Sequence, residues 1–369
     1  MTPLLWAAAA LAALGFALAV AIDERRNAAP ALPPAGGPCP TSAVLVPMRN
    51  EERNVVPCVE ALLAQTARPR IRILDDGSTD RTLPLAWERF GAEPRVEILE
   101  VGPLAPGWRG KLHALDRGWR GLDAPWVLTT DADVRSAPEL LERALRAAAD
   151  GGLDALSIAG RQEARGWGEN LLTPAVFAWL DVLLGDWRAA AEGRGTVANG
   201  QFLLLRRAAW DAAGGFATVR SAPIDDVAIA ARLHAAGFRI GFFRSPLLRV
   251  RMYQGAAETW SGWRRNLGAL FGAQPAKLLR LILALALPPA LLLAALCLRQ
   301  APAAVLLWAG GAATSALLRR GSDHAAAYGL LYPLDALALS ALAASCALDF
   351  RRGRLASWKG RPMDLDGTS

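Results

Sequence analysis

The stretch Trp126-Val127-Leu128-Thr129-Thr130-Asp131-Ala132-Asp133 decides the fold of this chain. Its first five residues are apolar or β-branched, which favours a buried β-strand. Two carboxylates, Asp131 and Asp133, then follow two positions apart and share one face if the backbone stays extended. Hard divalent cations prefer such oxygens together with the phosphates of a substrate. We therefore expect a cation site at the end of this strand, although ordinary surface acids would give the same pattern.

Other short strands and helices surround this stretch between residues 41 and about 250. The strand candidates are 42–46, 71–74, 96–101 and 126–130, and the helix candidates are 52–64, 82–90, 112–118 and 138–149. Strands that alternate with helices predict an α/β, Rossmann-like domain with a mostly parallel sheet. Ligands of such sheets bind beyond the carboxyl ends of the strands. The polar motifs of this chain follow its strand candidates directly, so we expect them to meet there.

The composition excludes several classes of protein. Of 369 residues, 53% are hydrophobic and 20% are charged, and 4 are cysteines, so the chain is neither disordered nor a disulfide scaffold. The net charge of +7 comes from arginine, since Lys111, Lys277 and Lys359 are the only lysines. Much of the arginine flanks apolar segments. We therefore expect anionic lipid or nucleotide phosphates as partners, and no nucleic acid.

An apolar segment near the N-terminus predicts a membrane anchor. Residues 4–22 carry no charge and are about long enough to span a bilayer. The sequence Asp23-Glu24-Arg25-Arg26 follows directly. Positive charge after the run favours an uncleaved anchor whose C-terminal end faces the cytoplasm, over a cleaved secretory peptide.

Three more apolar runs precede a basic tail. They are residues 278–298, 302–318 and 325–348. Three full spans that start in the cytoplasm would leave the tail outside, against the positive-inside rule. We therefore expect one run to be re-entrant or interfacial, with Pro288-Pro289 in the first run and Asp335 in the third as the features that disfavour a simple span.

Polar residues follow the first two strand candidates. Asp75 and Asp76 precede Gly77-Ser78-Thr79-Asp80, where two acids would hydrogen-bond a base and a ribose. An Asx turn is the alternative interpretation. Pro47 and Glu51 lie in the loop after residues 42–46, where Glu51 would also serve as an ordinary helix cap.

Three further segments suggest sites for a diphosphate and for an acceptor. Lys111 ends the glycine-containing stretch 106–111. This stretch would bind a diphosphate, and an ordinary exposed loop is the alternative interpretation. Asp225 and Asp226 begin a predicted helix whose apolar residues recur with helical spacing. One of these carboxylates would act as the general base on an acceptor hydroxyl, or the pair simply caps the helix. Gln201 precedes an apolar strand and would shape the acceptor side.

An aromatic and basic segment lies before the first C-terminal apolar run. Trp263 and Arg264 are its central residues. Tryptophan beside arginine is typical of the headgroup interface of a membrane. A lid over the donor diphosphate, with a groove for lipid entry, is an equally good interpretation.

In this order, the motifs resemble the membrane-bound, inverting family 2 glycosyltransferases with a GT-A catalytic domain. The resemblance covers about residues 41–275 and rests on Val-Pro-x-x-Asn-Glu, Asp-Asp-Gly-Ser-Thr-Asp, Gly-Trp-x-Gly-Lys, Asp-x-Asp and the acidic pair. The stretches 251–253, 262–266 and 358–361 look most like members that glycosylate carotenoids or accompany hopanoid genes.

The resemblance implies donor-binding roles for six residues, of which Asp131 also belongs to the metal motif described below. Pro47 and Glu51 would line the nucleoside pocket. Asp76, helped by Asp75, would contact the uracil or ribose, and Lys111 would lie near the donor.

The resemblance also implies a metal site and a base. Asp131 and Asp133 would bind Mg²⁺ or Mn²⁺, with Asp133 the stronger ligand. Asp226 would be the catalytic base. Its neighbour Asp225 is one methylene shorter than the first acid of the family's Glu-Asp pair.

The implied activity is transfer of a sugar from a nucleotide-sugar, with UDP as the favoured nucleotide. The implied acceptor is the hydroxyl or carboxyl of a membrane lipid such as a carotenoid or hopanoid. The Gln-x-x-Arg-Trp element of processive synthases is missing, which argues against polymer synthesis. One alternative is a polyprenyl-phosphate glycosyltransferase. Another is an inactive, nucleotide-sugar-sensing membrane scaffold.

The implied location is the bacterial inner membrane, in a multi-pass protein with a cytoplasmic catalytic domain. The predicted segments are an anchor (1–22), a Pro/Gly-rich linker (23–40), a GT-A domain (41–250), an interfacial segment (251–277), a C-terminal transmembrane region (278–348) and a basic tail (349–369).

Overall fold

The computed structural model forms two compact units. It describes residues 2–27, 31–37, 39–184, 192–193, 197–271, 275–321, 324–352, 357–358 and 361–362. We call Met1–Ala28, Gln162–Gly185 and Arg251–Asp366 the helical unit. We call Ala29–Arg161, Asp186–Val250 and Gly367–Ser369 the sheet unit. Lys277 lies in a described helix, whereas Lys359 and Gly360 of the predicted tail motif lie outside the described residues.

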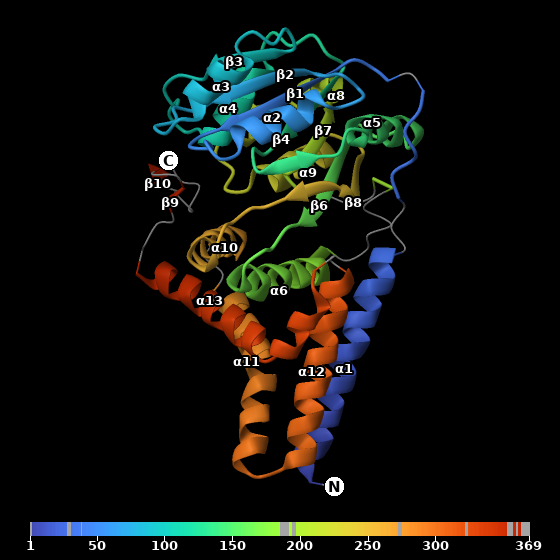
Figure 1. Cartoon of the computed structure of the whole chain (residues 1–369), viewed down its shortest axis with the longest axis vertical. Helices are drawn as coiled ribbons and strands as arrows, with labels where there is room; N and C mark the ends of the chain where they lie inside the picture. The colour runs from blue at the N-terminus through green and yellow to red at the C-terminus, as the bar shows by residue number, and fades with distance from the viewer. Residues whose placement is uncertain are drawn as a thin grey trace. The chain divides into compact units, whose positions relative to one another are not determined.

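The sheet unit is built on an eight-stranded sheet with the order β3-β2-β1-β4-β7-β6-β8-β5 (Figure 1). The strands are β1 (Ser42–Met48), β2 (Arg70–Asp75), β3 (Val96–Glu100), β4 (Trp126–Thr130), β5 (Val134–Ser136), β6 (Ala155–Gln162), β7 (Phe202–Arg206) and β8 (Ile240–Val250). β1 pairs in parallel with β2 and β4, and β2 pairs in parallel with β3. β7 then pairs antiparallel with β4 and β6. The parallel half corresponds to the strands predicted from the sequence.

Helices cover the sheet because its central strands are apolar on both faces. They are α2 (Val55–Leu63), α3 (Thr82–Phe90), α4 (Gly110–Trp119), α5 (Leu140–Asp150), α8 (Arg207–Ala212) and α9 (Asp225–Ala235). Leu45, Leu74 and Val127 share one buried cluster with residues of α4, α8 and α9. All five residues of β4 are buried. Such a run is expected of a strand covered on both sides.

The helical unit contains long apolar helices. They are α1 (Pro3–Asn27), α6 (Trp167–Leu184), α10 (Ala256–Phe271), α11 (Pro275–Cys297), α12 (Ala301–Gly321) and α13 (Leu334–Arg351), with the 3-10 helix η2 (Ala326–Leu331) before α13. α12 packs closely on α1, since a Cβ atom added to Gly310 would lie 2.4 Å from Cβ of Ala12. Small residues permit this close approach of two helix backbones.

Among the described residues, three helical segments are long and apolar enough to cross a membrane. They are Pro3–Glu24, Leu279–Cys297 and Ala301–Arg320. The third C-terminal apolar run, predicted as 325–348, is instead divided between η2 and α13. α13 begins beside Asp335 and ends with Asp349 and Arg351, which makes it less suited to the hydrocarbon core.

One helix groups differently from the predicted segments. α6 lies within the predicted domain 41–250 but belongs to the helical unit. Its Leu172 and Val176 are buried with Trp263 and with residues of α11 and α13. The chain order placed this helix between strands, whereas its apolar surface packs on other helices.

Candidate active site

Strand β4 carries the Asp131–Asp133 loop into a rigid position. The Thr129 hydroxyl donates to the Leu203 carbonyl at 3.3 Å, and the Thr130 hydroxyl donates to the Gln201 carbonyl at 2.6 Å. Both bonds tie β4 to β7 beside their antiparallel pairing. The loop after β4 therefore begins from a fixed backbone, as the stretch 126–133 predicted. Asp131 itself is partly exposed, at 34% of its side chain.

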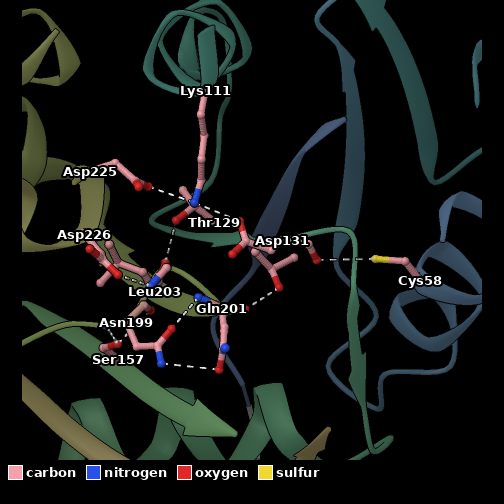
Figure 2. Close-up of polar contacts among 12 residues, drawn as sticks. Cys58, Lys111, Thr129, Asp131, Ser157, Asn199, Gln201, Leu203, Asp225 and Asp226 are labelled. Atoms are coloured by element: carbon pink, nitrogen blue, oxygen red, sulfur yellow. Dashed lines mark hydrogen bonds and ion pairs between the residues drawn. The ribbon is translucent and has the colours of Figure 1, made fainter. Parts of the chain in front are cut away.

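Lys111 joins two acidic segments that are far apart in the sequence. Its Nζ lies 2.8 Å from Oδ1 of Asp131 and 2.8 Å from Oδ2 of Asp225. Figure 2 shows the lysine side chain pointing between these two acids. Burial alone would lower the pKa of Lys111, but the two carboxylates raise it well above its usual value. The first turn of α4 therefore holds a permanent positive charge between the loop after β4 and the start of α9.

Asp226 is held by backbone groups at the start of α9. Its Oδ2 accepts a hydrogen bond from the Gly200 N–H at 2.7 Å, and its Oδ1 accepts one from the Val227 N–H at 2.8 Å. Burial, followed by the charge of Asp225, raises the pKa of Asp226 to about 7. The N-cap interpretation is thus incomplete, because one bond reaches back to the segment before β7.

Gly200 allows this approach because it has no side chain. A Cβ atom at this position would lie 2.9 Å from Nζ of Lys111, 3.5 Å from Oδ2 of Asp226 and 3.6 Å from Oδ2 of Asp225. Gln201 was predicted to shape the acceptor side, but this backbone role of the neighbouring Gly200 was not predicted. Asn199 fixes the turn, since its Oδ1 accepts the Gln201 N–H at 2.9 Å.

The carboxylate of Asp133 is suited to bind a cation. Burial, followed by the charges of Asp131 and Glu51, raises the pKa of its carboxyl to about 7. Its Oδ1 is buried and has no hydrogen-bond partner among the described residues. The same part of the chain contains no preformed group of three His, Cys, Asp or Glu side chains that would bind a metal by itself. Metal sites completed by substrate phosphates need only one or two carboxylates, so the residues present fit such a site.

The two loops after β1 and β2 support each other. The Asn50 N–H donates to Oγ of Ser78 at 3.0 Å, and the Thr79 N–H donates to Oδ1 of Asn50 at 2.7 Å. Asp75 makes the Asx turn given as an alternative above, because its Oδ2 accepts the N–H groups of Gly77 and Ser78 at 3.1 Å each. Its second oxygen, Oδ1, is buried without a hydrogen-bond partner among the described residues.

The other predicted nucleoside residues lie around these loops. Pro47 is half-buried near the end of β1 and pairs in register with Leu74 of β2. The Glu51 N–H donates to Oγ1 of Thr82 at 2.7 Å. Asp76 is 2% exposed at the end of β2. These residues therefore lie at the carboxyl ends of β1 and β2, where the fold predicts ligand binding.

His113 is a residue that the sequence analysis missed. It is 7% exposed on α4, two positions after Lys111, and its ring lies 5.7 Å from that of Trp108. Burial lowers the pKa of His113, and the charge of Asp76 acts in the opposite direction. A single histidine in a predicted helix does not indicate whether its side chain is buried or what it contacts. The position of His113 is evident only from the packing of α4 beside β2.

Trp263 and Arg264 lie in the helical unit. Trp263 is 3% exposed, its Nε1 donates to Oγ1 of Thr173 at 3.2 Å, and its ring packs edge-on against Phe177 and Tyr253. Nε of Arg264 lies 3.1 Å from Oδ2 of Asp349. Trp263 is therefore a core residue of the helical unit, and its burial argues against a free, lid-like ring.

The family follows from comparison with known proteins. Residues 43–211 match the sequence profile described as Glycosyl transferase family 2. These residues therefore form a domain of glycosyltransferase family 2. This match contains β1 to β4, Lys111, both acids of the Asp-x-Asp loop and Gly200, so the family resemblance inferred from the motifs is confirmed.

Several curated relatives of this chain are named for lipid substrates. A beta-monoglucosyldiacylglycerol synthase of Synechocystis sp. is 29% identical over 247 residues, covering 64% of this chain and 49% of that protein. A 4,4'-diaponeurosporenoate glycosyltransferase of Staphylococcus aureus is 25% identical over 248 residues, covering 65% of this chain and 64% of that protein. The chain thus spans about half the length of the first relative and less than two thirds of the second.

A solved structure shares the fold of this chain. A mannosyltransferase from Pyrobaculum calidifontis, in complex with GDP-Man and Mn²⁺, aligns over 95% of this chain and 94% of its own with a TM-score of 0.53 and 22% identity. The predicted GT-A class, an α/β sheet with many parallel strands and apolar helices toward both ends, is confirmed.

Proposed function

We propose that this protein is a non-processive, inverting glycosyltransferase that moves a sugar from a UDP-linked donor to the hydroxyl or carboxyl of a membrane lipid such as a carotenoid or hopanoid. The observation that carries the proposal is the cluster in which Lys111 joins Asp131 to Asp225, with Asp226 alongside. It brings a donor-side acid and an acceptor-side acid to one place in the sheet unit.

Asp226 is proposed as the general base. Two backbone N–H groups orient its carboxylate. Its pKa of about 7 lies near neutral pH, and a general base is most effective when its pKa is close to the working pH. The carboxylate would take the proton of the acceptor hydroxyl as that oxygen attacks the sugar. A single displacement needs one base and no nucleophilic carboxylate, so the anomeric centre is inverted.

Asp131 and Asp133 are proposed to hold Mg²⁺ or Mn²⁺ together with donor phosphates. The buried, unbonded Oδ1 of Asp133 is the main support for this assignment. A bound cation would neutralise charge on the departing diphosphate. Lys111 pairs with both Asp131 and Asp225, so it lowers the net negative charge that a donor phosphate would meet there.

A lipid acceptor is supported by the membrane segments and the relatives. Three candidate spans lie in the helical unit, and the two relatives are named for a diacylglycerol lipid and a carotenoid acid. With α1 and only α11 and α12 as spans, the Arg319-Arg320 cluster and the basic tail would both face the cytoplasm. This arrangement satisfies the positive-inside rule and leaves the sheet unit on the side where nucleotide-sugars are made.

The test is transfer by the Asp226→Asn variant. Purified full-length protein receives UDP-sugar, Mn²⁺ and lipid extracted from membranes, and labelled lipid is measured. Loss of a general base is expected to slow transfer about 10²- to 10⁴-fold while UDP binding is retained. Asp123→Asn, in an exposed position before β4, is the matched control and should keep full turnover. Unchanged turnover of Asp226→Asn would show that another group is the base.

Transfer to a polyprenyl phosphate is a second candidate. A relative from Pectobacterium carotovorum, an undecaprenyl-phosphate 4-deoxy-4-formamido-L-arabinose transferase, is 33% identical over 113 residues, covering 30% of this chain and 34% of that protein. A phosphate acceptor is already anionic and needs little help from a base. Asp226→Asn should then still transfer sugar to polyprenyl phosphate, which distinguishes this candidate from transfer to a lipid hydroxyl.

A further inference from the structure

The helical unit contains a cavity that the proposed catalytic residues do not use. Its volume is ≈ 190 Å³, and α1, α6, α11, α12 and α13 all contribute to its lining. This exceeds the volume of about 150 Å³ at which an apolar protein cavity binds benzene. The cavity is therefore large enough for part of a hydrocarbon chain or ring.

The polarity of the cavity changes along α12. Leu307, Gly310 and Gly311 line it in the first half of the helix. Toward the end of the helix the lining includes the polar residues Thr314, Ser315 and Arg319 beside Leu318. At 1.5 Å per residue, Leu307 and Arg319 are about 18 Å apart along the axis, close to half the ~30 Å hydrocarbon core of a bilayer. The lining therefore runs from apolar to polar residues over about the depth of one leaflet, and the cavity has room for part of one lipid.

The polar end is a buried ion pair without net charge. Nη2 of Arg319 lies 3.3 Å from Oδ2 of Asp335, and the two side chains are 3% and 8% exposed. Nε of Arg319 donates to Oγ of Ser315 at 3.1 Å, and Nη1 donates to the Asn170 carbonyl at 2.6 Å. A guanidinium carries five N–H groups, so within the described residues two remain to donate to an oxygen of a ligand.

The charges at this end favour a neutral ligand. Asp335 already neutralises Arg319, so a phosphate would bring a second anion beside Asp335 in a region of low dielectric. A hydroxyl, ester or carbonyl oxygen would accept from the remaining N–H groups without that cost. The apolar lining in turn excludes water and favours a hydrocarbon chain.

We propose that this cavity binds a single uncharged lipid, with its oxygen-bearing head at Arg319 and its chain along Leu307 and Gly311. The proposal rests on the proposed function in one respect only, namely that the bound lipid belongs to the acceptor class. Binding itself requires neither a donor nor catalysis.

The experiment is photolabelling of the full chain in phosphatidylcholine nanodiscs without any nucleotide-sugar. The probe is a long-chain alcohol that carries a diazirine near its methyl end, and labelled peptides are identified by mass spectrometry. Label is expected on the α12 peptide around Leu307 and Gly311. Ala336→Phe fills the cavity from α13 and should reduce this labelling about tenfold, while Ala341→Phe, on the exposed side of α13, should not change it.

A second arm tests the head group. The same diazirine chain, as an alkyl phosphate, should label the α12 peptide about tenfold less than the alcohol, equivalent to about 1.4 kcal/mol. Equal labelling by the phosphate, unchanged labelling of Ala336→Phe, or label spread evenly over lipid-facing helices would overturn the proposal. Ala178→Leu on α6 is a second filling variant if Ala336→Phe does not fold. Because no sugar is transferred, these outcomes are independent of the Asp226→Asn result.

Discussion

At the scale of residues, a single lysine organises the proposed active site. Lys111 contacts both Asp131 and Asp225 at 2.8 Å, and its Nζ would lie 2.9 Å from any Cβ at position 200. Charge-assisted hydrogen bonds of this length are stronger than neutral ones. The lysine therefore keeps several acids close together that would otherwise repel one another.

The pH dependence of transfer follows from the raised pKa of Asp226. Below about pH 7 this carboxyl is mostly protonated and does not act as a base, so kcat/KM should fall about tenfold per pH unit as the pH drops below 7. Above about 7 the rate should level off. The measurement is kcat/KM for lipid at fixed Mn²⁺ over this range.

The Asp225→Asn variant is the companion measurement. Burial is the larger cause of the raised pKa of Asp226 and the charge of Asp225 is the second, so removing that charge should move the acidic limb to lower pH. A limb that stays at the wild-type pH in Asp225→Asn, or a flat profile in the wild-type protein, would contradict Asp226 as the titrating base.

At the scale of elements, helix α4 owes its position to a glycine. A Cβ atom on Gly118 would lie 2.6 Å from both Cδ atoms of Leu74, which is fully buried in β2. This close packing brings the start of the same helix, with Lys111, to the carboxyl end of the sheet. The 112–118 segment was predicted as a helix, but its sequence did not indicate which strand it would contact.

The Gly118→Ala variant should therefore be destabilised. Overpacking against Leu74 is expected to cost about 1–3 kcal/mol, seen as a lower midpoint of thermal unfolding in detergent. Gly268→Ala in α10 is the matched control, because a Cβ atom there meets nothing within 4 Å and alanine favours helix. If both variants unfold at the wild-type temperature, Leu74 moves aside more easily than the packing indicates.

At the scale of the whole molecule, the number of spans decides the side of the tail. The sequence conflicted with the positive-inside rule only when 325–348 was counted as a span. The structure places η2 and the charged ends of α13 in that run, and three candidate spans remain among the described residues.

Reporter fusions test this arrangement. Green fluorescent protein fused at the C-terminus should fluoresce, and alkaline phosphatase fused after Gln300, between α11 and α12, should be active in a bacterial host. Fluorescence marks the cytoplasm and phosphatase activity marks the periplasm. Active phosphatase at the C-terminus would instead require a third C-terminal span.

Local patterns were sufficient to predict the family resemblance, the parallel half of the sheet and most acids of the candidate site. Apolar strands that end in carboxylates are such patterns, because they can be recognised without knowing what the chain contacts. Three features became evident from the folded chain alone: Lys111 joins Asp131 to Asp225, α6 packs with the helical unit, and Trp263 is a core residue. Those contacts link residues from separate segments, and they depend on which surfaces pack together, which no local pattern records.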